Sequence, residues 1–146
     1  MRVAILESIV MPAGHEVEFD RILINELKQQ GHEPVLFVPE NFPFKVDYGV
    51  DIVDLEGGEV VTYAGASKWK KPFLSILRER RRRSWFISAA QKIKEHKIDA
   101  LIIPTGTYRY IKALLDTPLK DSEASVHVIF HGIGKGEMDR FIKQAH

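Results

Sequence analysis

Short apolar runs alternate with amphipathic segments along this chain of 146 residues. The apolar runs are nearly continuous and rich in β-branched side chains, which is typical of strands buried on both faces of a parallel sheet. They predict strands at residues 2–7, 34–38, 59–63, 99–103 and 126–130. The stretch 39–54 contains Pro39, Pro43 and Gly49, and we expect it to be irregular.

Helical spacing occupies the segments between these runs, at residues 16–30, 84–97, 108–116 and 137–145. In the first segment one face carries Phe19, Ile22, Leu23 and Leu27, and Gly31 supplies a stop. Repetition of strand and helix predicts right-handed βαβ units. We therefore expect an α/β fold, a doubly wound, mainly parallel sheet of about five strands with helices on both faces (Rossmann-like), as a single domain over residues 1–146.

Composition narrows the class of protein without identifying it. A hydrophobic share of 45% and a charged share of 28% exclude a disordered or fibrous chain. No apolar stretch approaches the ~20 residues that cross a bilayer. The absence of cysteine excludes disulfides, thiolate zinc sites and a cysteine nucleophile, and fits a cytoplasmic protein. No histidine or carboxylate pair has a convincing metal-ligand spacing, so no metal site is predicted.

Ligands of doubly wound sheets bind beyond the carboxyl ends of the strands, so the residues after each strand are the candidates. Gly14 and His15 lie between the first predicted strand and the first helix. A glycine there lets a ligand approach the backbone, and a helix N-terminus favours an anion such as a diphosphate. His15 could act as a general base near neutral pH. An ordinary strand-to-helix turn with a solvated histidine is the other interpretation.

The first 38 residues resemble the opening of GT-B glycosyltransferases. The matching residues are Gly14, His15, Leu23, Leu27, Gly31, His32 and Val35. The resemblance implies that His15 deprotonates the acceptor hydroxyl, as in inverting members, or that Gly14 lies against the donor diphosphate, as in retaining members. It also implies a sugar-facing Thr105 or Thr107, and a nucleotide sugar as co-substrate with no further cofactor.

GT-B enzymes combine two Rossmann-like halves, and this chain has the length of one. The resemblance therefore implies the N-terminal, acceptor-side half of a nucleotide-sugar-dependent glycosyltransferase. Such a half transfers a sugar to a hydroxyl acceptor only when a C-terminal donor-binding half or a partner subunit completes it. We expect the chain alone to be inactive.

A glycine-rich segment follows the last predicted strand. It contains His131, Gly132, Gly134 and Lys135, and it precedes a predicted helix. Backbone N–H groups of such a segment could cradle a phosphate, although the spacing matches neither common phosphate-binding motif. The GT-B resemblance implies that His131 approaches the donor sugar. A flexible turn, or a non-catalytic nucleotide- or phosphate-binding module, is the alternative.

The formal net charge of +1 hides a strongly basic segment at residues 68–83, where eight cations accompany the single acid Glu79. The candidate contacts with a polyanion or membrane are Trp69, Lys70, Lys71, Arg80, Arg81, Arg82 and Arg83. Interleaved cations and aromatic residues suit an anionic membrane surface, here the inner face of the cytoplasmic membrane, for an enzyme or an adaptor. A solvated helix whose apolar residues join the core is the alternative. Nucleic acid is disfavoured because no RNA-binding motif is visible.

Overall fold

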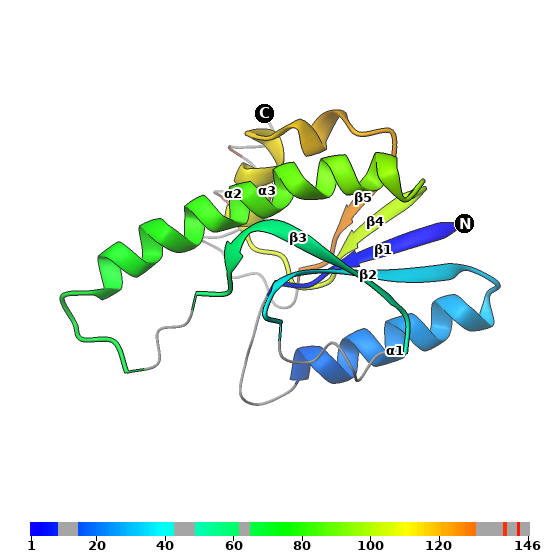
Figure 1. The fold of residues 1–146 in the computed structure, drawn as a ribbon, viewed down its shortest axis with the longest axis horizontal. Coiled ribbons are helices and arrows are strands. Elements are labelled where there is room, and N and C mark those ends of the chain that lie inside the picture. Colours follow the sequence, from blue (N-terminus) through cyan, green and yellow to red (C-terminus); the bar gives the residue numbers. More distant parts are fainter. Residues whose placement is uncertain (9–14, 43–48, 62–64, 131–138, 140–142, 144–146) are drawn as a thin grey trace.

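The computed structural model describes residues 1–8, 15–42, 49–61, 65–130, 139 and 143 (Figure 1). Its elements are β1 (Arg2–Leu6), α1 (His15–Gln29), β2 (Glu33–Glu40), β3 (Asp51–Glu59), α2 (Lys71–Glu95), β4 (Ala100–Ile103), α3 (Tyr108–Leu115), the 3₁₀ helix η2 (Pro118–Asp121) and β5 (Ser125–Val128). The five strands form one parallel sheet in the order β3-β2-β1-β4-β5. This arrangement confirms the predicted α/β class.

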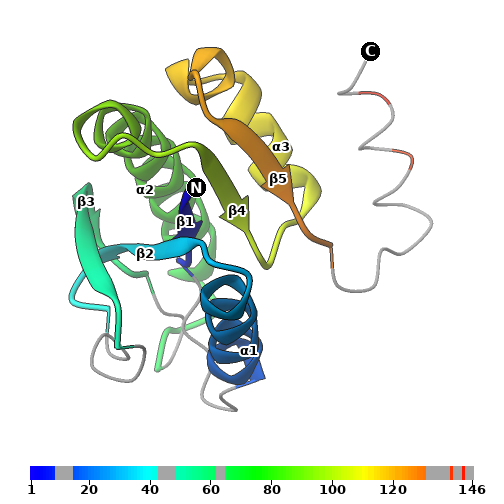
Figure 2. The same cartoon turned by 90° about the vertical axis from the view of Figure 1, so that its right-hand side faces the viewer.

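Helices cover both faces of the sheet, as Figure 2 shows with α1 on one side and α2 and α3 on the other. Successive side chains of a strand point to opposite faces. Ile5 of β1 accordingly packs with Ile24 of α1, whereas Ala4 and Leu6 pack with the aromatic residues of α2. Both faces of β1 and β2 are thus buried, which explains their continuous apolar sequences.

The third strand was predicted wrongly. The structure places β3 at Asp51–Glu59 instead of at 59–63, so the strand begins within the stretch 39–54 that was expected to be irregular. Because β3 is an edge strand, its exposed and buried positions alternate and it has no continuous apolar run. Gly57 and Gly58, just before the last residue of this strand, have positive φ angles, a conformation that glycine adopts without strain.

The second helix is longer than predicted. It begins at Lys71 instead of residue 84, with Pro72 in its first turn, where a missing N–H costs nothing. Its first half has no amphipathic period, because that half is not packed on the sheet. Figure 1 shows these first turns projecting past the end of β3. Arginine and leucine still favour a helix there through their intrinsic propensity.

Two smaller expectations concern helix faces and ends. Ile22 was expected to face the core, but it is exposed, and Ile24 occupies the buried position of α1. The fourth predicted helix, 137–145, lies almost wholly outside the described residues. None of the helices in the described ranges has the length and apolar content that a bilayer crossing requires.

Candidate functional site

The strand order changes direction between β1 and β4. The chain proceeds outward from β1 to β2 and β3, and then crosses back to place β4 on the other side of β1. Helices on opposite faces diverge at such a position, which is where doubly wound folds bind their ligands. Glu7 and Ser8 follow β1 at this edge, and residues 104–107 follow β4.

The turn after β4 carries two of the predicted site residues. Thr105 and Thr107 are half-buried, and Thr107 immediately precedes α3 in an extended conformation. Between them the backbone N–H of Gly106 donates to the carbonyl of Ile129 at 2.8 Å. A Cβ at Gly106 would overlap a methyl carbon of Val128, so glycine allows this turn to lie directly against the end of β5. The two threonines are thereby held at the carboxyl edge.

The other residues predicted to bind substrate are described only in part. His15 is the first residue of α1, which places its backbone after β1 in the chain, as expected. Gly14, His131, Gly132 and Gly134 lie outside the described residues. In the ranges that the structure describes, no group of three or more histidine or acidic side chains is placed to hold a metal ion.

A buried polar chain lies beneath this edge, and the sequence did not reveal it. The hydroxyl oxygens of Ser8 and Tyr110 are 2.8 Å apart, and both residues are buried. The guanidinium carbon of Arg82 lies 4.6 Å from the centre of the Tyr110 ring, in cation–π contact. Burial raises the pKa of the Tyr110 hydroxyl above its ordinary value of 10.0, against the opposing effect of Arg82. Tyr110 therefore remains a neutral hydrogen-bonding group at physiological pH.

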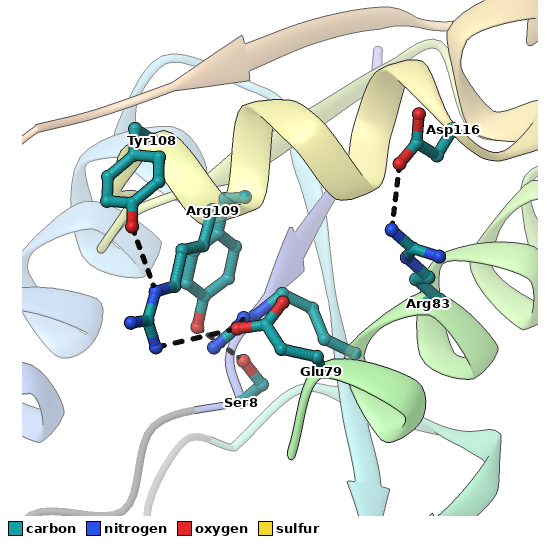
Figure 3. Close-up of polar contacts among 8 residues, drawn as sticks. Ser8, Glu79, Arg83, Tyr108, Arg109 and Asp116 are labelled. Atoms are coloured by element: carbon teal, nitrogen blue, oxygen red, sulfur yellow. Dashed lines mark hydrogen bonds and ion pairs between the residues drawn. The ribbon is translucent and has the colours of Figure 1, made fainter. Parts of the chain in front are cut away.

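This series of polar contacts continues from Arg82 to the surface through Glu79. Arg82 donates to the Glu79 carboxylate at 2.6 Å, and Arg109 of α3 approaches the same oxygen at 3.6 Å. Figure 3 shows Arg109 reaching toward Glu79 across the space between α3 and α2. One carboxylate thus joins two guanidinium groups from two helices. In the sequence, this series of contacts is indicated only by the polar Ser8, which closely follows an apolar strand.

The predicted basic contacts divide into exposed and engaged side chains. Trp69, Lys70, Lys71 and Arg80 are exposed. Arg81 donates to the carbonyl of Glu59, and Arg83 pairs with Asp116 at 2.9 Å. Arg82 is only 6% exposed, so it faces the protein interior and is withdrawn from the surface on which it was placed.

The apolar residues of the same segment divide in a similar way. Trp85 and Phe86 belong to the core, and the indole N–H of Trp85 donates to the carbonyl of Gly58 at 3.0 Å. Trp69, Phe73 and Ile76 are instead 87%, 74% and 56% exposed. The first half of α2 and the residues before it therefore present large apolar side chains among cations.

Several solved glycosyltransferases share this fold. MurG from Acinetobacter baumannii is 17% identical, with a TM-score of 0.53, and the match covers 96% of this chain and 39% of MurG. SsfS6 from Streptomyces sp. SF2575 is 14% identical, with a TM-score of 0.54, and the match covers 99% of this chain and 44% of SsfS6. SnogD from Streptomyces nogalater is 16% identical, with a TM-score of 0.53, and the match covers 93% of this chain and 44% of SnogD. No family model and no curated protein matches the sequence.

These likenesses show the fold of one GT-B domain. At such low identities they show the fold alone, and this chain spans less than half the length of each of these three proteins. The chain thus has the architecture that the resemblance of residues 1–38 implied.

Removing the guanidinium of Arg82 should destabilise the domain. We expect Arg82→Met to lower the free energy of unfolding by about 2 kcal/mol, because it breaks a charged hydrogen bond and a buried cation–π contact. The matched variant Arg80→Met, two residues earlier on the same helix and exposed, should change it by less than about 0.5 kcal/mol. Urea unfolding measures both. Equal effects of the two variants would contradict the buried role of Arg82.

Proposed function

We propose that this chain is the acceptor-side domain of a nucleotide-sugar-dependent glycosyltransferase. It would transfer a sugar to a hydroxyl together with a C-terminal half or partner subunit that binds the donor. The observation that carries the proposal is the shared fold with MurG, SsfS6 and SnogD, in which this chain corresponds to only part of each enzyme. SsfS6 has also been solved with thymidine diphosphate, which supports a nucleotide-linked donor.

The residues proposed for the reaction follow β1, β4 and β5 in the amino-acid sequence. His15, at the start of α1, is the proposed base that accepts the proton of the acceptor hydroxyl. Thr105 and Thr107 would hydrogen-bond the acceptor from the turn after β4. Gly14, His131, Gly132 and Gly134 are proposed to approach the donor. If the enzyme is retaining, Gly14 takes the place of His15 as the important residue of its turn.

A transfer assay tests this proposal. The tagged chain is purified from its native cells together with whatever completes it, and is incubated with labelled UDP-, GDP- and TDP-sugars and membranes from the same cells. We expect label in a glycosylated product, and His15→Ala should lower kcat by about 10²- to 10⁴-fold, the usual contribution of a general base.

His32→Ala is the matched control. His32 lies at the amino end of β2, where its ring contacts the N-terminal amine of Met1 at 3.3 Å, far along the strands from the proposed site. We expect this variant to keep the wild-type rate. Transfer from none of the donors would contradict the glycosyltransferase proposal. A wild-type rate in His15→Ala would remove the base assignment and favour the retaining chemistry.

We further propose that the exposed part of the basic segment contacts the anionic inner face of the cytoplasmic membrane. The supporting observation is the high exposure of Trp69, Phe73 and Ile76 beside Lys70, Lys71 and Arg80. Each cation near an anionic leaflet contributes about 1 kcal/mol, and aromatic side chains add to this. A membrane-surface adaptor would use the same residues, and absence of transfer together with membrane binding would favour it.

Flotation with anionic vesicles tests this contact. Replacing Lys70, Lys71 and Arg80 by serine should weaken vesicle binding about 100-fold, since three cations contribute about 3 kcal/mol. Arg82 is kept, because changing it would disturb the buried chain. A control variant replaces three other exposed lysines, Lys28, Lys94 and Lys120, by serine. Equal binding by the two variants would show only a dependence on net charge, and would contradict the assignment to α2.

A further inference from the structure

A groove lies between the first half of α2 and the start of α3. Its volume is about 270 Å³, several times the ~30 Å³ share of one water molecule. Ser75, Ile76, Glu79 and Arg83 line it from α2, and Tyr108, Arg109 and Lys112 line it from α3. Figure 3 shows Arg109 and Arg83 on the two sides of this space.

Cations dominate the lining of the groove. Arg83, Arg109 and Lys112 contribute three positive charges against the single carboxylate of Glu79, and Arg83 is also paired with Asp116 at 2.9 Å, so the charges that Asp116 does not balance are those of Arg109 and Lys112. That carboxylate is already engaged by the buried Arg82, which approaches it 1.0 Å more closely than Arg109 does, at 2.6 Å against 3.6 Å. The groove therefore retains a net positive charge, which favours an anion over a neutral ligand.

Arg109 is oriented before any ligand arrives. Its Nε donates to the hydroxyl of Tyr108 at 3.4 Å, and its guanidinium carbon lies 5.9 Å from the centre of that ring. Its 3.6 Å contact with Glu79 is an ion pair longer than a good hydrogen bond. An oxyanion with two adjacent oxygens could exchange for this looser contact, because guanidinium forms bidentate bonds with phosphate.

The groove has one apolar wall, and this wall continues onto the exposed surface of α2. Ile76 lines the groove, and Phe73 lies three residues earlier, so the two side chains neighbour each other on the helix surface. Both are more than half exposed. An anion that carries a hydrocarbon chain would therefore find its charged group in the groove and its chain along α2.

We propose that the groove between α2 and α3 binds the phosphate group of an amphiphile, a phosphate ester attached to a hydrocarbon chain. Arg109 and Lys112 contact the phosphate oxygens, and Ile76 and Phe73 contact the chain. This inference deepens the proposed function and rests on its membrane contact. The proposed membrane contact needs only a general attraction between α2 and an anionic surface, whereas the groove would recognise one chemical group, the phosphate.

Binding of soluble ligands to the whole chain tests the groove. The probes are dihexanoyl phosphatidic acid below its micellar concentration, dihexanoyl phosphatidylcholine and inorganic phosphate, with affinities from calorimetry and the site from amide shifts by NMR. We expect phosphatidic acid to bind most tightly and to shift the amides of Tyr108, Arg109 and Lys112. Arg109→Gln with Lys112→Gln should weaken it at least about tenfold, since charged hydrogen bonds are lost.

The control removes the same charge elsewhere, with Lys94→Gln and Lys120→Gln, and should leave the affinity unchanged. If both double variants weakened the binding of phosphatidic acid equally, or if phosphatidylcholine bound with equal affinity, the assignment of the binding site to the groove would be wrong. Equal affinity for inorganic phosphate would overturn the assignment to an amphiphile. Glycosyl transfer that persists without groove binding refutes only this inference, whereas groove binding without transfer refutes only the proposed enzyme.

Discussion

Trp85 and Phe86 pack one face of α2 against the sheet, and Arg82 holds the helix against Tyr110 of α3; the orientation they set extends through all 25 residues of the helix. The second half of the helix covers β3, β2, β1 and β4, where its aromatic side chains are almost completely buried. The first half continues in the same direction past the sheet, so its side chains have no strand to cover. The second half of this helix therefore covers the core, whereas its first half, from Lys71 to residue 81, is an exposed arm. Arg82 lies at the junction of the two halves.

This junction connects the arm to the carboxyl edge of the sheet. From Glu79 the contacts pass through Arg82 and the ring of Tyr110 to Ser8, which directly follows β1. Such buried polar chains are stable only when each member has its partner, because an unpaired group in a low-dielectric interior is costly. The position of the arm and the geometry of the edge are thus fixed together. A substrate bound at the edge and a surface bound by the arm would therefore contact two ends of the same series of side-chain contacts.

The sequence predicted the central strands well and the periphery poorly. β1, β2 and β4 are buried on both faces, so their apolar runs identify them without ambiguity. β3 is an edge strand with alternating exposure and two glycines, and no local pattern distinguished it from a loop. The charge run 80–83 gave no sign that Arg82 alone is buried, because helical rotation and the partner Tyr110, 28 positions later, decide this. Candidate residues after strands could be named from the topology, whereas the cluster around Tyr110 required the three-dimensional contacts.

Hydrogen exchange with and without anionic vesicles tests the division of α2 most directly. If the first half of the helix is a membrane-facing arm, vesicles should slow amide exchange over residues 68–80 and leave residues 85–95 unchanged, since the latter are already protected by the core. Unchanged exchange over 68–80 at vesicle saturation would contradict this account. Faster exchange over 85–95 would contradict it as well, because it would mean that the helix leaves the sheet when it binds.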